Sequence, residues 1–484
     1  MNRQLRRVSV LVLLLFVALF ASTSIIQVFE ADSLRTDPRN SRTLYQSFSA
    51  QRGSILVDGK AIAQSTASDD LYKYLREYTD GKIYAPATGF FSVVNGSTGI
   101  ESSLNDYLSG TANAQFLDKL GSLLSGQDPK GASVELTLDA SVQKAAYDAL
   151  GTRKGAVVAI DPKTGAILAM VSTPSYDPNT LAGHNTSKVS STYAKLSANS
   201  GTPLINRAIA GDLYHPGSVF KLVVATAALE SGKYTLDSTF PNPRTLQLPQ
   251  SSTSISNIGG GVCGGGKTVS IATALRLSCN IPMAELGLAL GYDAINATAK
   301  KLGYGDTFHV PMAVTPSLYP SGMDDAQLML SSFGQYDDRV TPLQVALTSA
   351  AIANGGQLMQ PTLVKRIIAP DLTELQTLTP TVYSTAMSAS SASAMTTAMV
   401  ADVANGVASN ARISGVDVAG KTGTAENGTG QSNTLWFTGF APAKDPQVAV
   451  AVVLEDGGGE GANGVGNLVA APIAKKVMEA VLNR

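Results

Sequence analysis

The sequence predicts an α/β protein with two folded regions behind one membrane-spanning helix. Its 484 residues exceed the length of a typical single domain, so two folded regions are expected. Hydrophobic residues make up 44% of the chain, which is enough for a sizeable core. From residue 155 onward, apolar runs of strand length alternate with longer stretches of helical pattern, which indicates a domain built from both strands and helices.

The composition excludes several classes of partner. Charged residues make up 15% of the chain, and the formal net charge is -1. No basic patch or arm stands out, so we expect no nucleic-acid partner. The three histidines are scattered, no H-E-x-x-H string is present, and two cysteines alone cannot build a structural zinc site. We therefore expect neither a metal nor another cofactor.

The N-terminus predicts a membrane anchor. The uncharged stretch Val8–Phe29 spans roughly 30 Å as a helix, enough to cross a bilayer core. Because three arginines precede it, residues 1–7 are expected in the cytoplasm and the remainder of the chain outside the cell membrane. A cleaved signal peptide is the alternative. The long apolar run and the lack of a clear A-x-A site favour the anchor, whereas polar residues near its end leave cleavage open.

A boundary near residue 154 separates the two folded regions. Residues 30–154 are expected to form a small N-terminal domain, and residues 155–484 the larger one. The larger domain opens with two apolar runs, Ala156–Ile160 and Ala166–Val171. The Asp-Pro-x-x-Gly sequence between them is typical of a turn, so the pair predicts a β-hairpin.

The remainder of the larger domain contains helices, strands and loops. Apolar periodicity and flanking Ser and Gly residues place them. We expect helices over Val219–Glu230, Ser270–Leu277, Ser384–Ala404 and Ala470–Leu482, strands over Leu435–Phe440 and Val448–Leu454, and glycine-rich loops over 251–266 and 457–466.

Three short strings in a fixed order make the strongest functional signal. Each string is weak alone, but the set supplies a serine nucleophile, a lysine general base, a proton relay and an oxyanion site. The strings are Ser218-Val219-Phe220-Lys221 (S-x-x-K), Ser278-Cys279-Asn280 (S-x-N) and Lys421-Thr422-Gly423-Thr424 (K-T-G-T).

The chain also contains decoys of all three strings. Chance alone gives S-x-x-K about once or twice in a chain of this length. Ser141 to Lys144 is such a match, in a helical stretch with nothing to activate the serine, and we interpret it as a solvated helix face. Ser197 to Asn199 is a second S-x-N. Lys163-Thr164-Gly165 is a second K-T-G, and it forms the predicted hairpin turn.

The setting of Ser218 distinguishes it from the decoys. His215-Pro216-Gly217 precedes it, and a buried helical stretch follows, so Ser218 is expected at a helix N-terminus, where the dipole favours a developing alkoxide. Lys221 lies three residues on, on the same helix face. Burial and the second cation, Lys421, would lower the pKa of Lys221 and let it act as a neutral base. A Ser-His-Asp triad is disfavoured because no G-x-S-x-G elbow surrounds the serine.

The only cysteines, Cys263 and Cys279, could form a disulfide outside the membrane. Cys263 lies in a glycine-rich run, and Cys279 is the middle residue of S-x-N. A bond between them would hold that loop beside the site and contribute about 3 kcal/mol in the chain-entropy model. Two unpaired thiols are the alternative. Neither cysteine has the setting of a nucleophile.

With these residues in view, the chain resembles the transpeptidase domain of class B penicillin-binding proteins. The similarity extends beyond the three strings and covers nearly the whole chain from residue 51. A small N-terminal region without a C-terminal module is most similar to the actinobacterial A-type members. Further matching motifs are Arg52-Gly53-Ser54-Ile55, Asn206-Arg207-Ala208, Tyr214-His215-Pro216-Gly217, Thr341-Pro342-Leu343-Gln344 and Ala353-Asn354-Gly355-Gly356.

The resemblance implies a fold and a reaction. The fold would be a five-stranded antiparallel sheet flanked by helices, with a helical subdomain and a small N-terminal pedestal. The enzyme would cross-link peptidoglycan stem peptides through an acyl-enzyme on Ser218 and would be acylated by β-lactams. A polytopic glycosyltransferase and other cell-wall machinery of division or elongation are the implied partners.

The resemblance also implies a role for each residue of the three strings. Ser218 would attack the penultimate D-Ala carbonyl, with Lys221 as base. Ser278 would relay a proton to the leaving D-Ala, with Lys421 close by, and Asn280 would bind the peptide backbone. Lys421, Thr422 and Thr424 would hold the terminal carboxylate, and Gly423 would let substrate lie along the strand edge. The backbone N–H groups of Ser218 and Thr424 would form the oxyanion hole.

Two classes of alternative function use the same residues. A D,D-carboxypeptidase or a β-lactamase of the same fold would transfer the acyl group to water instead of an amine. A β-lactam sensor or scaffold would not turn over, but the intact set of active-site residues and the lack of a signalling module disfavour this reading. A long-lived acyl-enzyme with a β-lactam would argue against a β-lactamase, and amine-dependent product would argue against a carboxypeptidase.

Overall fold

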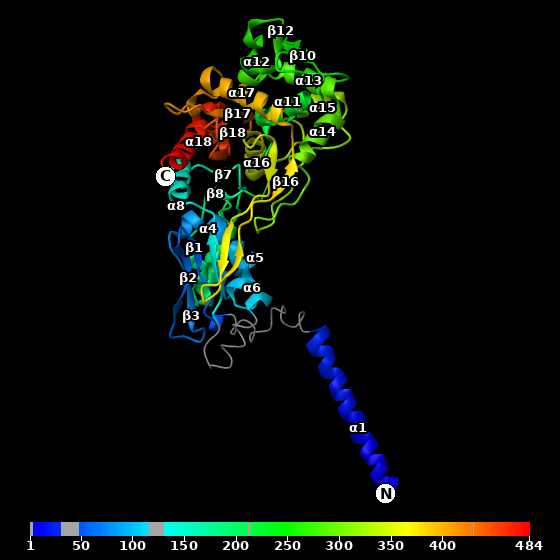
Figure 1. Ribbon diagram of the computed structural model, residues 1–484, viewed down its shortest axis with the longest axis vertical. Helices are drawn as coiled ribbons and strands as arrows, with labels where there is room; N and C mark the ends of the chain where they lie inside the picture. Colours follow the sequence, from blue (N-terminus) through cyan, green and yellow to red (C-terminus); the bar gives the residue numbers. More distant parts are fainter. Residues whose placement is uncertain (1–2, 31–47, 116–129, 212, 429) are drawn as a thin grey trace.

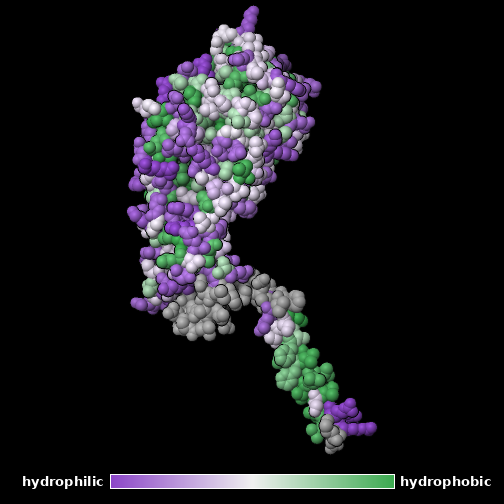
Figure 2. Space-filling model, in the orientation of Figure 1, coloured by the Kyte–Doolittle hydropathy of each residue, from purple (hydrophilic) through white to green (hydrophobic). Residues whose placement is uncertain are grey.

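The computed structural model describes residues 3–30, 48–115, 130–211, 213–428 and 430–484. Helix α1 (Arg3–Ser24) continues into a short π-helix (Ile25–Phe29) and has no buried residues. Its span, residues 3–27, is long and apolar enough to cross a membrane. Figure 2 shows its hydrophobic surface. Parts of the predicted N-terminal domain, residues 31–47 and 116–129, lie outside the described residues.

The N-terminal domain is built on a six-stranded sheet with the order β15-β14-β6-β1-β2-β3. We call this sheet with helices α4, α5 and α6 the pedestal. Its N-terminal elements are β1 (Ile55–Val57), β2 (Lys60–Ala67), β3 (Tyr74–Tyr78), α4 (Gly81–Thr88), β4 (Phe91–Ser92), β5 (Gly96–Ser97), α5 (Gly99–Ser103), α6 (Asn105–Leu108) and β6 (Ser133–Leu136).

Two strands of the pedestal come from far along the chain. Strand β14 (Val364–Ile368) pairs antiparallel with β6, and β15 (Glu374–Thr377) pairs with β14. In Figure 1 these yellow strands run down beside the blue strands of the pedestal. A single cut at residue 154 therefore does not separate the two sheets, because residues 364–377 belong to the pedestal.

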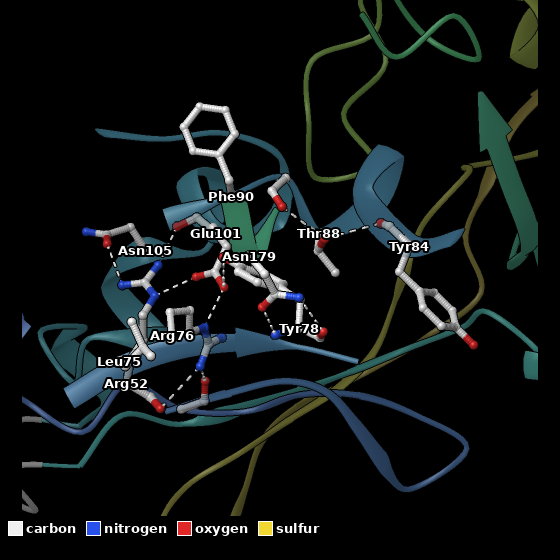
Figure 3. Close-up of polar contacts among 12 residues, drawn as sticks. Arg52, Leu75, Arg76, Tyr78, Tyr84, Thr88, Phe90, Glu101, Asn105 and Asn179 are labelled. Atoms are coloured by element: carbon white, nitrogen blue, oxygen red, sulfur yellow. Dashed lines mark hydrogen bonds and ion pairs between the residues drawn. The ribbon is translucent and has the colours of Figure 1, made fainter. Parts of the chain in front are cut away.

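A buried ion cluster lies inside the pedestal (Figure 3). The Glu101 carboxylate on α5 is fully buried, and its two oxygens each lie 2.6 Å from an arginine Nε, one from Arg52 and one from Arg76. Burial alone would raise the pKa of Glu101, but the two guanidinium groups outweigh it and hold that pKa below its usual value. Arg52 also donates to the Asn105 side chain, and Arg76 donates to the Gly53 carbonyl. The cluster fixes strand, loop and helix together.

Side-chain amides join the pedestal to the larger domain. Asn179, on α9 (Asn179–Ala182), accepts from the Tyr78 backbone N–H and donates to the Tyr78 carbonyl, both at 2.9 Å (Figure 3). Asn206 donates to the Pro86 carbonyl at 2.7 Å. These bonds satisfy polar backbone groups at the junction and connect the two regions through well-ordered contacts.

The larger domain contains the expected five-stranded antiparallel sheet, with the order β17-β18-β19-β7-β8. Its three inner strands are buried on both faces, and alternate side chains belong to two separate cores. Helices α8 and α18 cover one face and α16 the other. The elements are α8 (Ala140–Leu150), β7 (Gly155–Ile160), β8 (Ile167–Thr173), α16 (Pro342–Ala353), β17 (Ala419–Ala425), β18 (Thr434–Ala441), β19 (Val448–Leu454) and α18 (Gly466–Leu482).

The helical subdomain lies beyond the α16 face of the sheet, at the top of Figure 1. Its buried helix α11 packs against α13, α14 and α17. The other helices and strands of the larger domain, within and outside this subdomain, are α10 (Thr186–Ser197), α11 (Lys221–Glu230), β9 (Thr239–Pro241), β10 (Thr245–Gln247), β11 (Ser254–Ser256), β12 (Thr268–Ser270), α12 (Ile271–Arg276), α13 (Ile281–Leu290), α14 (Tyr292–Lys301), α15 (Asp325–Ser331), β13 (Gln357–Met359), β16 (Val382–Thr385) and α17 (Ala389–Asn405).

The structure confirms most predicted elements and corrects three. The predicted loop over 251–266 contains the strand Ser254–Ser256, which pairs with β10, and two short 3-10 turns. The predicted helix over Ser384–Ala404 begins too early, because Val382–Thr385 is a strand and Ser388 caps the helix by accepting from the Ser391 N–H. The predicted loop over 457–466 contains two short 3-10 turns, and the closing helix starts at Gly466 instead of Ala470.

Candidate active site

Ser218 lies in one turn of 3-10 helix, Gly217–Phe220, that leads directly into α11. The predicted helix therefore starts as a tighter turn than expected. Two glycines, Gly217 and Gly334, allow the backbone of this turn to pack closely against the segment behind it. Gly217 has φ +53° and donates its N–H to the Gly334 carbonyl at 2.9 Å. A Cβ on Gly334 would lie 1.9 Å from the Gly217 carbonyl oxygen. The nucleophile turn is thus held from behind by backbone contact that only glycine permits.

The same turn packs onto strand β17, which carries the K-T-G string. A Cβ on Gly423 would meet the Pro216 carbonyl oxygen and the Val219 side chain, each at 3.2 Å. In this structure the missing side chain of Gly423 therefore makes room for the Ser218 turn as well as for a peptide at the strand edge. The K-T-G glycine brings the first and third strings together.

Lys221 is fully buried, and its amine is surrounded by acceptors. Its Nζ lies 2.8 Å from the Ser278 carbonyl oxygen, 2.8 Å from Asn280 Oδ1 and 2.9 Å from Ser218 Oγ. The orientation of the Asn280 amide is fixed because its Nδ2 donates to the Ser256 carbonyl. A neutral amine has two N–H bonds and one lone pair. Two of the three neighbours are obligate acceptors, and the third is the Ser218 hydroxyl, which can accept a hydrogen from an ammonium or donate one to the lone pair of a neutral amine.

The electrostatics of the site favour that neutral form. Burial lowers the pKa of Lys221 well below its usual value, the Lys421 cation lowers it further, and Asp402 opposes the change in part. A lysine with a depressed pKa can accept the Ser218 proton near neutral pH.

Ser278 and Asn280 are held in place by their own loop. Ser278 adopts a left-handed backbone conformation, φ +57°, which is uncommon for a residue with a side chain and typical of strained functional positions. Its Oγ lies 3.4 Å from Lys221 Nζ. The buried Asn257 side chain accepts from the N–H groups of Asn280 and Ile281 at 2.9 and 3.0 Å. A Cys263–Cys279 disulfide, spanning 16 residues, ties the glycine-rich loop to this turn.

Lys421 is buried on β17, an edge strand of the sheet. Its Nζ lies 3.4 Å from Asp402 Oδ2 on α17 and donates to the Thr422 carbonyl at 3.1 Å. Burial lowers the pKa of Lys421, and Asp402 opposes that change. The free edge of β17 offers unpaired backbone groups to an extended ligand. On the same strand, Thr424 Oγ1 accepts from the Gly466 N–H at 3.3 Å.

The structure brings together the predicted residues and leaves the decoys elsewhere. Ser141 is on the exposed face of α8, where its hydroxyl donates to the capping Asp139. Lys163 is in the β7–β8 turn and pairs with exposed Asp445. His215 Nδ1 lies 2.7 Å from Arg339 Nη1, and its carbonyl accepts from the Trp436 ring N–H. These contacts give His215 a structural role.

Sequence reasoning missed Asp402 and Asn257. Asp402 is the one charged residue in the helix Ala389–Asn405, and a lone carboxylate among small and apolar residues is a signal that could have identified it. Asn257 carries no such signal, because it lies in a Ser- and Gly-rich stretch whose contacts only the folded chain creates.

The chain matches two protein families. Residues 155–479 match the penicillin binding protein transpeptidase domain, and residues 52–134 match the penicillin binding protein A dimerisation domain. The chain is 43% identical to the peptidoglycan D,D-transpeptidase PbpA of Mycolicibacterium smegmatis, over 100% of this chain and 99% of that protein. It is 41% identical to the protein of the same name from Mycobacterium tuberculosis, with the same coverage.

Solved structures agree with these matches. The ceftriaxone acyl-enzyme complex of penicillin-binding protein A from M. tuberculosis superposes with a TM-score of 0.87 at 39% identity, over 90% of this chain and 100% of that one. Its penicillin G acyl-enzyme complex gives a TM-score of 0.85 at the same identity and coverage.

Proposed function

The chain belongs to the class B penicillin-binding proteins and is a peptidoglycan D,D-transpeptidase, and we propose that Ser218 is its nucleophile and Lys221 its general base. The observation that supports this assignment is the arrangement around Lys221 Nζ. Two obligate acceptors lie 2.8 Å from Nζ and Ser218 Oγ lies 2.9 Å from it, so once the lowered pKa leaves the amine neutral, its two N–H bonds meet the acceptors and its lone pair faces Ser218. Buried in this way, the amine is ready to take a proton at the moment the serine reacts.

In the acylation step, Ser218 Oγ bonds to the carbonyl carbon of the penultimate D-Ala of a stem peptide. The hydroxyl proton moves to Lys221 Nζ, and the charge that develops on the carbonyl oxygen is stabilised by the N–H groups of Ser218 and Thr424. Each such donor is worth about 3 kcal/mol in the transition state. The peptide C–N bond then breaks, and Ser278 passes a proton to the leaving D-Ala nitrogen.

In the second step, an acceptor amine attacks the acyl-enzyme and loses a proton to the same relay, which frees Ser218 and leaves a new amide cross-link. Lys421, Thr422 and Thr424 hold the terminal carboxylate of the donor, and Asn280 hydrogen-bonds its backbone. A β-lactam carries a carboxylate and a strained amide in similar positions, so it acylates Ser218 by the first step.

The apolar helix α1 fits a single-pass membrane protein. We infer an orientation with residues 1–7 in the cytoplasm, because the arginines precede the span, and with the transpeptidase domain outside. A polytopic glycosyltransferase is the proposed partner, since cross-linking requires newly made glycan strands and the two families that the chain matches are a transpeptidase domain and a dimerisation domain.

The assignment is tested by labelling the full chain in detergent with a fluorescent penicillin. Wild type and the decoy variant Ser141→Ala are expected to give a stable covalent band, and Ser218→Ala none. A band that persists in Ser218→Ala would exclude Ser218 as the nucleophile. Rapid turnover of the label would favour a β-lactamase, and release of D-Ala without amine-dependent product would favour a carboxypeptidase.

A further inference from the structure

Asp402 has an unusual position for a carboxylate. It lies in the last turn of α17, its side chain is 1% exposed, and neither carboxylate oxygen has a hydrogen bond of normal geometry, although the Val407 and Ala408 N–H groups and the Lys421 amine are near enough to lower its pKa. Its contact with a charged group is the one with Lys421 Nζ, at 3.4 Å. Buried carboxylates are usually saturated with hydrogen bonds, so this one is not explained by what it adds to the fold.

The site of Asp402 disfavours its charge in two ways. Burial raises the pKa of its carboxyl to about 6, although Lys421 opposes the change. The C-terminal end of a helix also carries partial negative charge, which is unfavourable for an anion. A carboxylate kept in such a place requires a compensating partner, and Lys421 is within reach.

Charge balance then fixes the protonation of three buried groups. Lys221, Lys421 and Asp402 are all at least nine-tenths buried. If both lysines were protonated, the cluster would hold an uncompensated buried charge, which is costly. One carboxylate balances one lysine. Since the carboxylate of Asp402 pairs with Lys421 and the contacts of Lys221 are to uncharged acceptors, the balancing cation is Lys421.

We propose that Asp402 is a positioning residue of the transpeptidase reaction: it is the counterion that keeps Lys421 a cation, and Lys421 in turn keeps Lys221 a neutral base. This inference rests on the proposed roles of Ser218 and Lys221. It adds a residue outside the three sequence strings whose charge sets the protonation of two residues within them.

Other charged groups around α17 do not replace this pairing. Arg276, on the adjacent helix α12, donates to the Asn405 carbonyl at 3.3 Å. Arg412, after the following turn, donates to the Val403 carbonyl at 3.0 Å. Both arginines therefore bind the backbone at the end of α17, and neither has a described ion pair with Asp402.

The test measures the second-order rate constant of acylation by a fluorescent penicillin from pH 5 to pH 10. Full-length protein in detergent is used, and rates are expressed per titrated active site. In Asp402→Asn, Lys421 loses its counterion and deprotonates at lower pH, so it no longer holds the penicillin carboxylate there. We expect the alkaline limb to move down by at least one pH unit and the rate at pH 9 to fall at least about tenfold.

Matched variants separate this effect from a structural one. Asp417→Asn removes an exposed carboxylate two residues before β17 and is expected to leave the profile unchanged. Asp402→Glu restores the charge and is expected to restore most of the alkaline limb. If Asp402→Asn lowers the melting temperature but its profile per active site superimposes on that of wild type, the residue is structural and the proposal is overturned.

A double-variant comparison keeps the test decisive if Asp402→Asn alone folds poorly. Adding Asp402→Asn to Lys421→Met removes both charges together, and no further change in the pH profile is expected. A further shift in that background would mean that Asp402 acts through another group, which overturns the proposal. Persistent labelling of Ser218→Ala would instead contradict the proposed function, so the two failures are distinguishable.

Discussion

The molecule contains two buried clusters that each combine two basic side chains with one carboxylate. In the pedestal, Glu101 lies between Arg52 and Arg76, with both carboxylate oxygens 2.6 Å from a guanidinium nitrogen. In the active site, Asp402 pairs with Lys421 at the longer distance of 3.4 Å, and neither of its carboxylate oxygens has a hydrogen bond of normal geometry. Lys221, the third member, bonds to the S-x-N turn and to Ser218.

The difference teaches how the cation type decides what a buried cluster does. Arginine stays protonated and binds carboxylate with a rigid fork, so the pedestal cluster is fixed in charge and geometry. Lysine shifts its pKa readily when buried, so the active-site cluster can hold a neutral amine and exchange protons. The first arrangement supports structure, and the second supports catalysis.

Placing an arginine in the active-site cluster is expected to have the largest effect. In Lys221→Arg the base cannot deprotonate, so acylation by penicillin should fall about 10³–10⁴-fold, the upper range for a general base. The rate constant is measured per folded molecule, with the decoy variant Lys144→Arg on the exposed face of α8 as control. Acylation at more than a tenth of the wild-type rate would show that Lys221 is not the base.

Removing the carboxylate of the pedestal cluster is expected to cost stability instead of activity. Glu101→Gln leaves two buried guanidinium groups without a counterion, so the free energy of unfolding should fall by about 3–5 kcal/mol. Denaturant unfolding of the pedestal measures it. Acylation per folded molecule should stay within a factor of two, and a large loss there would mean that the pedestal cluster reaches the active site.

Giving the pedestal cluster a lysine is expected to have a smaller effect. Arg76 Nε binds Glu101 while its Nη1 donates to the Gly53 carbonyl at 2.8 Å. Arg76→Lys retains the charge but loses one of these bonds, at a cost of about 2 kcal/mol. The same unfolding assay checks this value. A cost equal to that of Glu101→Gln would mean that geometry, and not charge balance, dominates the cluster.

The smallest expected effect is the change in acylation rate and in stability for each unit of pH. Because the pKa of Lys221 is lowered, the neutral base is present above that pKa, and acylation should fall about tenfold per pH unit below it. Because the pKa of Glu101 is also lowered, its stabilisation is complete above its unfolded pKa of about 4.3 and is lost only as pH falls through the folded value.

A pH series of acylation and of unfolding on the same samples separates the two responses. Acylation should decline on the acid side while the pedestal remains fully stable. An acylation midpoint near 10.5, the ordinary value for lysine, would contradict the neutral base. Loss of pedestal stability already at pH 6 would contradict a Glu101 carboxylate that is fully ionised and paired with both arginines at that pH.

The sequence predicted the parts of the site that are local in the chain. The three strings have fixed spacings, and helix and turn signals around Ser218 placed it at the start of α11. Asp402 could not be found in that way, because its meaning depends on α17 packing against β17. The helix predicted from Ser384 began too early for a similar reason, since residues 382–385 pair with β13 and only the folded chain shows it.

The domain division shows the same limit. The boundary at residue 155 matches the start of the five-stranded sheet, and apolar periodicity was sufficient to predict its opening hairpin. No local signal assigns residues 364–377 to the pedestal. The sequence pattern of these two strands does not differ from that of other strands. Their pairing with a strand more than 200 residues away is set by tertiary packing.

That long-range pairing imposes an order on biosynthesis. Strand β6 has an open edge until β14 and β15 have been made, so the pedestal cannot complete its sheet while the chain is still short. The N-terminal region must wait, with an unpaired strand exposed, until most of the other domain has left the ribosome. A chain that ended between β6 and β14 would leave the edge of β6 unpaired and prone to aggregation. The two regions are therefore expected to complete their folding together.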